Sequence, residues 1–275
     1  TWTTQTIDSA GSVGLYSSID TDQSGNVHIS YYDSSNLNLK YATNSTGTWT
    51  TQTIDSNGDV GAYPSIAIDS SGKAYVSYYD STNSDLKYAA NASGTWITQT
   101  IDNNGYSGDT SLVVDSSGKV HVSYFSWDGS TYNFKYATNS SGTWTTQHIN
   151  SNTSTWCASL DLDSSDKAHI SNSYWNGSNY ELMYANNVSG SWTTETVDNS
   201  RYVYYSAIVI DLADKPHICY FDSNNYSLQY ATVLDTTPPE ISSTSPSDGE
   251  NNVSVNTAIK ATFSKAMDVS TIGTS

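Results

Sequence analysis

Hydrophobic and polar residues alternate along short stretches of this chain, and the stretches recur in groups of four. One such group occupies residues 48–55, 65–69, 74–80 and 85–89. Each stretch is rich in β-branched or aromatic residues and is bounded by Gly, Asn, Asp or Ser, which is typical of strands joined by turns. The stretches lack the 3.6-residue period of a helix. The pattern therefore predicts an all-β protein.

The same stretches carry bulky side chains on both faces. In AYVSYYD (74–80), for example, apolar and aromatic residues fall on odd and even positions alike. An antiparallel sheet with one face in solvent would show a polar face. We therefore expect sheets that are packed on both sides, as the blades of a β-propeller are.

The group of four strands occurs five times. Residues 1–47 and 48–94 align without a gap, and three further copies occupy 95–142, 143–190 and 191–233. A period of this length predicts a propeller or a solenoid. A closed ring is favoured, because an open stack would leave apolar faces bare at both ends. The chain begins with a Trp-bearing strand and its last copy ends at 230–233, one strand short of a blade, so the N-terminal strand around Trp2 is expected to complete the last blade.

The expected fold is thus a five-bladed β-propeller of four-stranded antiparallel blades over residues 1–233, closed by the N-terminal strand. The chain resembles the extracellular repeat propellers of bacteria and archaea. Its count and period are similar to those of the five-bladed tachylectin-type lectins. The lectins' own repeat motif is absent, so this second resemblance covers architecture only and implies no sugar-binding residue.

A different pattern follows the repeats. Residues 234–239 contain two consecutive prolines, which favour an extended chain, and are expected to form a linker. Residues 240–275 resemble the opening of the bacterial Ig-like domains of surface-layer and adhesin proteins. The matching positions are Pro246, Asp248, Gly249, Asn252, Val253, Phe263, Ser264, Met267 and Asp268. The resemblance implies a truncated Ig-like domain in a secreted or cell-surface protein, because such a sandwich needs about 100 residues. Self-association through the tail strands is the alternative.

Composition narrows the classes of partner. The 275 residues carry 10 Lys and Arg against 27 Asp and Glu, a net charge of −17. Such a surface repels phosphate backbones and anionic lipid, so neither nucleic acid nor membrane insertion is expected. Glycans remain as the expected partner. The two cysteines, Cys157 and Cys219, either form one disulfide or are two small buried hydrophobes.

Residues found in every copy are expected to belong to the scaffold. An aspartate precedes each Ser-Ser-Gly-like turn (Asp22, Asp69, Asp115, Asp163 and Asp211) and is expected to cap that turn, with calcium binding as the alternative. A histidine recurs at one strand position, except in the second copy, which has Tyr75. These histidines are interpreted as interior and satisfied. Hence no cofactor and no metal site is predicted.

Residues that break the repeat are the candidates for function. They gather in two loop families, which are expected at the same rim of the propeller. One face would then combine aromatic rings with Asp and Asn, as sugar recognition requires. The candidate ligand-binding residues are Tyr16, Tyr63, Asp33, Asp80, Trp127, Asp128, Trp156, Trp175, Asn176, Arg201, Tyr202, Tyr204 and Asp222.

Catalytic motifs are scarce. Arg201 is the only arginine, whereas a sialidase needs several, and four glutamates include two in the tail. The pattern also lacks a zinc-type cluster, a phosphate-binding loop and G-x-S-x-G. We therefore expect no catalytic residue and no enzyme, but a non-catalytic glycan-binding or adhesion module. The alternatives are a polysaccharide lyase that acts on uronate through Arg201, and a structural spacer or assembly unit of a surface layer or fibre.

Overall fold

A computed structural model describes residues 1–91, 94–151, 155–200, 202–234 and 240–264, with only the backbone of 106–107 and 155–157. Two compact units divide the chain, Thr1–Thr232 and Val233–Ser275. The described residues form strands and no helix, which confirms the all-β prediction. They accordingly contain no helix that could cross a membrane.

The first unit consists of consecutive antiparallel sheets, each built from strands in chain order. The first two sheets contain β1 (Val13–Thr21), β2 (Val27–Asp33), β3 (Asn38–Thr43) and β4 (Thr50–Asp55), then β5 (Val60–Ile68), β6 (Ala74–Asp80), β7 (Asp85–Ala90) and β8 (Ile97–Asp102). The next two contain β9 (Tyr106–Val114), β10 (Val120–Trp127), β11 (Tyr132–Thr138) and β12 (Thr145–Ser151), then β13 (Thr155–Leu162), β14 (Ala168–Trp175), β15 (Tyr180–Asn186) and β16 (Thr193–Asp198).

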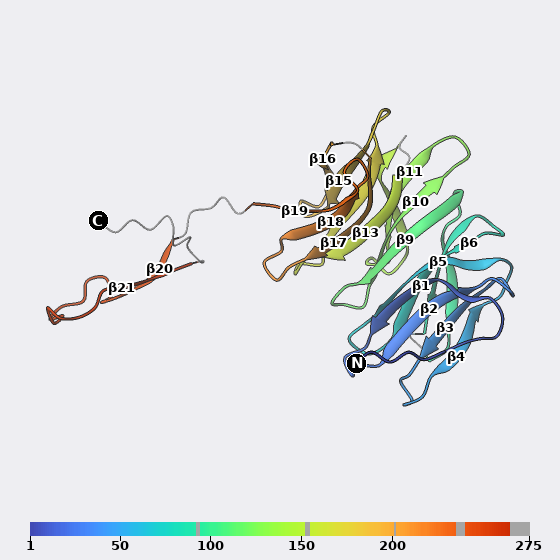
Figure 1. Cartoon of the computed structure of the whole chain (residues 1–275), viewed down its shortest axis with the longest axis horizontal. Helices are drawn as coiled ribbons and strands as arrows, with labels where there is room; N and C mark the ends of the chain where they lie inside the picture. Colours follow the sequence, from blue (N-terminus) through green and yellow to red (C-terminus); the bar gives the residue numbers. More distant parts are fainter. Residues whose placement is uncertain (92–93, 152–154, 201, 235–239, 265–275) are drawn as a thin grey trace. The chain divides into compact units, whose positions relative to one another are not determined.

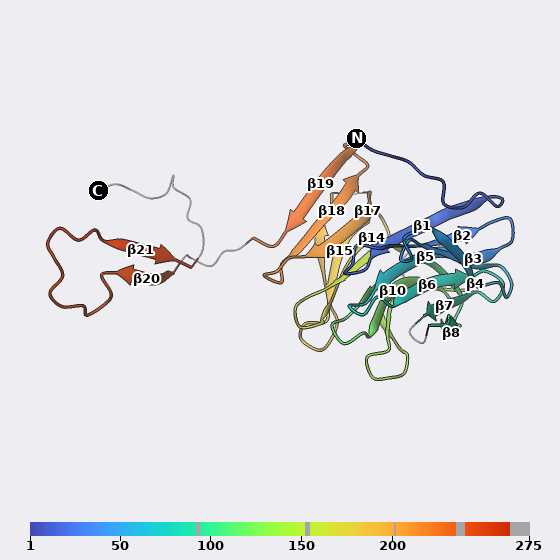
Figure 2. The same cartoon turned by 90° about the horizontal axis from the view of Figure 1, so that it is seen from below.

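The fifth sheet has three strands rather than the predicted four. It consists of β17 (Val203–Ile210), β18 (Pro216–Asp222) and β19 (Ser227–Thr232), and β19 is its edge. Residues 1–8 form no strand, and Trp2 is 99% exposed. The structure thus shows successive sheets like propeller blades (Figures 1 and 2), but the predicted closure by the Trp2 strand is not formed.

Neighbouring sheets are joined through their first strands. The hydroxyl of Ser18 on β1 accepts the amide N–H of Ile66 on β5 at 3.2 Å. Ser65 accepts that of Leu112 at 3.0 Å, and the two further pairs of this serine ladder are Ser111 with Leu160 and Ser159 with Ile208. Because the same repeat position is used each time, the first strands lie in register and point the same way.

The core lies between successive sheets, which confirms packing on both faces for the second, third and fourth sheets. Between the first and second sheets, Leu39 and Tyr41 pack against Val60, Val76 and other buried residues of the second sheet. Three similar clusters follow along the chain. Burial of large side chains on both faces explains why the strands show no polar face.

The recurring Asp and His residues belong to this scaffold. Nδ1 of His169 lies 2.5 Å from the hydroxyl of Tyr184, and its Nε2 lies 3.3 Å from Asp163. The turn aspartate Asp163 also accepts the amides of Ser165 and Lys167. The interior, satisfied histidine is therefore confirmed here. Within the described residues, no group of three or more His, Cys, Asp or Glu could hold a metal ion.

Cys219 is free and exposed. A disulfide with Cys157 is therefore not formed, and Cys219 is not the small buried hydrophobe of the other interpretation. The side chain of Cys157 lies outside the described part of the structure.

The second unit contributes one hairpin, β20 (Ile241–Ser245) paired with β21 (Lys260–Phe263). Both strands are exposed along their whole length. This unit supplies no described cluster of catalytic side chains, so the candidate site is sought in the first unit.

Candidate functional site

The two loop families meet at one end of each sheet, which we call the loop rim. It comprises the starts of β1, β5, β9, β13 and β17 and the ends of the second strands that pair with them. Val13 faces Asp33, Tyr106 faces Trp127, and Val203 faces Asp222 across these pairs. The expectation of a common rim for both families is confirmed.

A cavity of about 230 Å³ opens at this rim where three consecutive sheets meet. It is lined by the same two repeat positions of β1, β5 and β9, namely Tyr16 and Ser17, Tyr63 and Pro64, and Asp109 and Thr110. Drug-sized ligands occupy pockets of roughly 300–1,000 Å³. This cavity is therefore suited to a single small polar unit rather than to an enclosed chain.

Two tyrosine rings form one wall of the cavity. The ring centroids of Tyr16 and Tyr63 lie 4.4 Å apart at 40°, and Tyr16 is 48% exposed. Tyr32 stands behind Tyr16 at 6.4 Å and donates its hydroxyl to Asp59 at 2.7 Å. The rings thus present an apolar surface that is still open to solvent.

The backbone holds these tyrosines in an unusual conformation. Tyr16 and Tyr63 have φ angles of 52° and 51°, in the left-handed region. Each sits at a bulge where the register with the second strand shifts. Such a conformation costs about 1–3 kcal/mol per residue and is concentrated at binding sites. Both tyrosines line the cavity at the rim.

Asp109 was missed by the sequence analysis. It occupies the repeat position of Tyr16 and Tyr63, so it departs from the pattern as clearly as the tryptophans do. The neighbouring Thr110 donates to the carbonyl of Tyr63 at 3.2 Å and contacts the hydroxyl of Ser77 at 2.8 Å. These bonds fix the β9 side of the cavity against β5. A comparison of repeat positions, in place of a count of acids, would have found Asp109.

A second group of aromatic rings lies on the fourth and fifth sheets. Trp175 is 4.9 Å from Tyr180, which is 5.1 Å from Tyr204, and Tyr205 follows at 6.3 Å and is 70% exposed. On the third sheet, Trp127 lies 4.4 Å from Tyr132. The predicted site residues Trp127 and Trp175 therefore each pair with a tyrosine ring of the following strand. Tyr202, at the start of the fifth sheet, is 41% exposed with φ 56°.

The predicted aspartates have a different role. Asp33, Asp80 and Asp222 are 1–3% exposed. Asp80 accepts the backbone and side-chain N–H groups of Asn83, both at 3.0 Å, and Asp222 accepts the side chain of Asn225 at 2.7 Å. Asp33 accepts the backbone and side-chain N–H groups of Asn36 in the same way. Because their oxygens close the turn after the second strand, these carboxylates are not available to a ligand.

The polar residues beside the tryptophans also bind their own turns. Asp128 accepts the amide of Ser130 at 2.9 Å, its hydroxyl at 2.8 Å and the amide of Thr131 at 2.8 Å. The bonds from Ser130 lower the pKa of Asp128 to about 2. Asn176 accepts the amides of Ser178 and Asn179 and donates to Glu181. Arg201 and the side chain of Trp156 lie outside the described residues.

The two units are similar to different known proteins. Residues 235–275 match the family model of a bacterial Ig-like domain, in agreement with the predicted tail. Curated protein sequences give no match. The chain is similar in structure to a Hadza microbial sialidase at a TM-score of 0.56 and 14% identity, over 83% of this chain and 58% of the sialidase.

Two further solved structures share the fold. One is the Aleuria aurantia lectin in complex with α-methyl-L-fucoside, at a TM-score of 0.53 and 14% identity over 81% of this chain and 80% of the lectin. The other is a Penicillium chrysogenum α-L-arabinanase complexed with arabinobiose, at a TM-score of 0.53 and 12% identity over 81% of this chain and 81% of the arabinanase. Identities this low establish the shared fold alone.

These structures correct the prediction that the chain is not an enzyme. A sialidase and an arabinanase share this fold, so the fold itself gives no ground for excluding catalysis. The scarcity of Arg and Glu was too narrow a criterion, because Asp109 places a carboxylate in a rim cavity. The chain is therefore similar to lectins and glycoside hydrolases in the fold of its first unit, and to bacterial Ig-like domains in its second.

Proposed function

We propose that the loop rim recognises glycans, with the cavity between Tyr16, Tyr63 and Asp109 as the main subsite. The single observation that carries the proposal is this pairing of a strained, half-exposed tyrosine wall with a carboxylate across about 230 Å³. Flat rings cover the C–H face of a sugar, and a carboxylate accepts its hydroxyl groups. The fold shared with a fucoside-binding lectin supports the proposal.

The second aromatic group extends this proposal along the rim. Trp175, Tyr180 and Tyr204 form a contiguous series of rings on the fourth and fifth sheets. A polysaccharide that is held by its terminal unit in the cavity could lie over further rings on other sheets. Several weak contacts on one chain give a stronger overall affinity than one contact alone.

Binding is tested with a glycan array, followed by calorimetry on the best ligand. Tyr16→Ala and Tyr63→Ala are expected to weaken binding at least tenfold, which corresponds to about 1.4 kcal/mol. Tyr226→Ala is the matched control, since Tyr226 is also exposed and left-handed at φ 50° but lies outside the cavity. Equal losses in all three variants, or none in the cavity variants, would reject this subsite.

Glycoside hydrolysis at the same cavity is the second candidate, and Asp109 is the observation that favours it. Hydrolysis ordinarily needs two carboxyl groups, and Asp59 belongs to the same side-chain network through Tyr32 and Tyr16. If the site is catalytic, Asp109→Asn abolishes release of reducing sugar from the bound glycan while its affinity falls only modestly. Unchanged turnover in Asp109→Asn, or no product from any bound glycan, would reject hydrolysis at this site.

We further propose that the five sheets are the five blades of one propeller and that the chain belongs to a secreted or cell-surface protein. The match of residues 235–275 to a bacterial Ig-like domain supports the surface location. An antibody against the first unit should label intact, unpermeabilised cells. Labelling that requires permeabilisation would place the protein inside the cell instead.

A further inference from the structure

A tyrosine ring and an aspartate hold an ammonium group between the first and second sheets. Nζ of Lys87 lies 2.6 Å from the carboxylate of Asp55 and 5.7 Å from the ring centroid of Tyr78. The hydroxyl of Tyr78 donates to the same carboxylate at 2.7 Å. The face of an aromatic ring attracts a cation within about 6 Å of its centroid, and a carboxylate accepts strong hydrogen bonds from an ammonium group. Tyr78 and Asp55 therefore bind a cation that the chain itself supplies.

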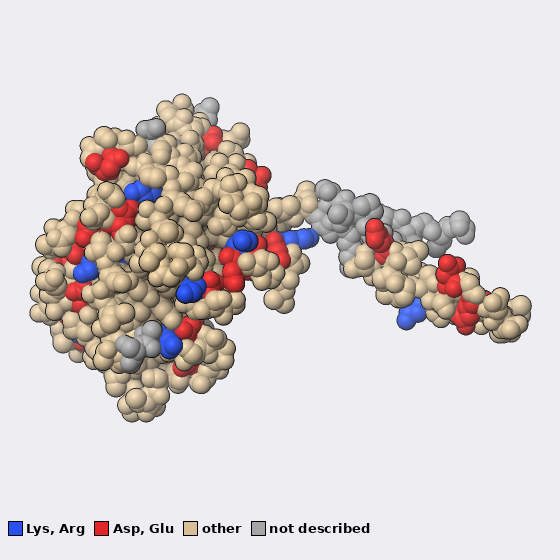
Figure 3. Space-filling view, turned by 180° about the vertical axis from the view of Figure 1, so that it is seen from behind, with Lys and Arg blue, Asp and Glu red and all other residues tan. Residues whose placement is uncertain are grey.

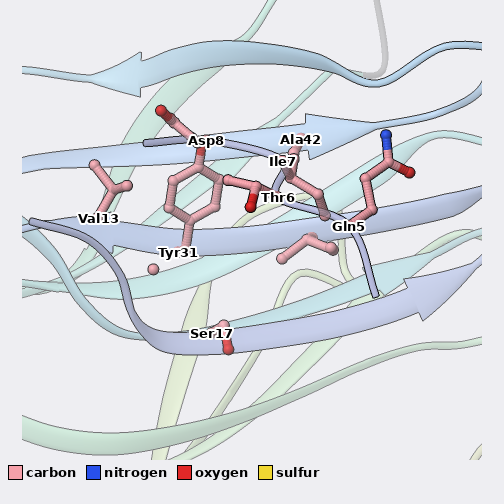
Figure 4. A pocket seen from close by; sticks show the side chains of 10 residues that line it. Gln5, Thr6, Ile7, Asp8, Val13, Ser17, Tyr31 and Ala42 are labelled. Atoms are coloured by element: carbon pink, nitrogen blue, oxygen red, sulfur yellow. The ribbon is translucent and has the colours of Figure 1, made fainter. Parts of the chain in front are cut away.

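The same arrangement borders a cavity of about 270 Å³ on the first sheet (Figure 4). Tyr31 and Asp8 both line this cavity, and the hydroxyl of Tyr31 donates to Asp8 at 2.7 Å. Nζ of Lys40 pairs with Asp8 and lies 5.7 Å from the ring centroid of Tyr31. The carboxylate of this cavity is therefore already neutralised by a lysine of the chain.

The cavity at the loop rim contains the same kinds of group without a lysine. Among the described residues that line it, Asp109 is the one charged side chain. Tyr16 and Tyr63 supply two rings whose centroids lie 4.4 Å apart at 40°, and Tyr16 is half exposed. A ligand can therefore supply here the ammonium group that Lys40 and Lys87 supply elsewhere.

The charges around the rim cavity also favour a cation. Tyr32 stands behind Tyr16 and donates its hydroxyl to Asp59 at 2.7 Å, so a second carboxylate lies beyond the tyrosine wall. The whole chain has a net charge of −17. Such a field raises the local concentration of cationic ligands. A uronate or a sialate would instead bring its own carboxylate into the cavity that Asp109 lines, where the two charges repel each other.

An amino sugar offers what each of these groups can bind. A hexosamine with a free amino group carries an ammonium group on a ring that also has apolar C–H faces and hydroxyl groups. One tyrosine ring can cover a C–H face, while the exposed Ser17 at the cavity can bond to a sugar hydroxyl. The N-acetylated sugar has the same ring but lacks the charge.

We propose that the rim cavity selects glycans that carry a free, protonated amino group over neutral or acidic glycans of similar shape. Asp109 pairs with the ammonium group, and the faces of Tyr16 and Tyr63 adjoin it. This selectivity rests on the proposed glycan binding at the same cavity and adds the class of sugar.

A matched pair of glycans tests the selectivity. Calorimetry on the full chain compares a glucosamine oligosaccharide with its N-acetylated form of equal length, in a mildly acidic buffer that keeps the amine protonated. The glucosamine form is expected to bind at least about fivefold more tightly. Equal affinities would overturn the selectivity but leave glycan binding in place. Binding of neither form, nor of any other glycan, would reject the glycan recognition on which the selectivity rests.

A substitution at Asp109 tests which carboxylate is responsible. Asp109→Asn keeps the shape of the side chain and is expected to bring the ratio of the two affinities close to one. Asp85→Asn is the matched control, because Asp85 is also half-buried and begins β7 at the same rim, but lies outside the cavity. The control makes the same change in net charge and should keep the ratio. An equal fall in both variants would assign the selectivity to the general acidity of the surface and contradict the proposal.

A lysine introduced into the cavity tests the analogy with Lys40. Ser17 lines the cavity next to Tyr16 and is exposed. Ser17→Lys is expected to weaken binding of the glucosamine oligosaccharide at least about tenfold, because the introduced ammonium group repels that of the ligand. Ser17→Gln adds a long neutral side chain and should keep most of the affinity. Equal losses in the two variants would show a purely steric effect and overturn the proposal.

Discussion

At the scale of single residues, buried aspartates at the ends of the outer strands connect the first sheet to the second and the second to the third. Burial raises the pKa of Asp55, but the hydrogen bonds from Lys87 and Tyr78 outweigh it and lower the pKa overall. Asp102 with Tyr124 and Lys135 repeats the arrangement, at 2.6 and 2.9 Å. Each of these carboxylates therefore accepts hydrogen bonds that exist only in the folded state, and these bonds stabilise the fold.

The pH dependence of stability follows from Asp8. The hydrogen bond from Lys40, with those from Ala10 and Tyr31, lowers its pKa from 3.8 to about 2. A lowered folded-state pKa adds stability above the unfolded value, and this stability is lost as the pH falls from about 4 to about 2. Unfolding free energy measured by urea titration should fall over this window. In Asp8→Asn, part of that fall should be absent; an identical slope would contradict the assignment.

The second prediction at the residue scale concerns the hydroxyl of Tyr78. It is fully buried and donates to the ionised Asp55, and a hydrogen bond to a charged group contributes about 1.5–3 kcal/mol. Tyr78→Phe is therefore expected to lower the unfolding free energy by about 2 kcal/mol. Tyr226→Phe is the control, because Tyr226 is 84% exposed. A loss below about 0.5 kcal/mol would show that Asp55 is satisfied by Lys87 and solvent.

At the scale of elements, the hairpins after the second strands combine aromatic rings with carboxylates that close the turn. Asp80→Ala is expected to destabilise the fold by about 2 kcal/mol, because the N–H groups of Asn83 lose a charged acceptor. Asp80→Asn keeps one acceptor oxygen and should recover part of the loss. Glycan affinity of the folded variants should be unchanged; a selective loss of affinity would return Asp80 to the binding site.

Most of the strands could be predicted from the sequence, because the alternation of apolar and polar residues and the turn residues determine strands directly. The strands around 48–55 and 74–80 and the sheet packing on both faces follow from the pattern. The role of Asp80 did not follow, since a carboxylate before a turn looks alike whether it caps the turn or faces a ligand. Asp109 was overlooked because its meaning depends on alignment with Tyr16 and Tyr63, and the left-handed φ of those tyrosines arises from bulges that have no simple sequence pattern.

At the scale of the whole molecule, the surface is acidic but sparsely charged. The net charge is −17, yet charged side chains cover only small parts of the face seen in Figure 3, and wide uncharged areas lie between them. Ser, Thr, Asn and Tyr therefore provide much of the polar surface. A neutral glycan can approach such a surface with little electrostatic penalty, whereas an anionic polymer is repelled more strongly as the ionic strength falls.

The division into two compact units gives a prediction at the same scale. The units Thr1–Thr232 and Val233–Ser275 each make most of their contacts internally. Removal of residues 233–275 should therefore leave the main calorimetric transition within about 2 °C of its original temperature. A larger shift would show that the second unit supports the first.

The serine ladder has a consequence for how the chain can change in length. Each hydroxyl receives an amide 47–49 residues further along. Duplication or loss of a complete repeat leaves every remaining serine opposite a suitable amide, whereas an insertion of half a repeat inside a strand would not. At the fifth copy the position is Ala207, which has no hydroxyl to offer. A sheet placed after the fifth would therefore lack the hydroxyl acceptor that joins the first strands of the earlier sheets.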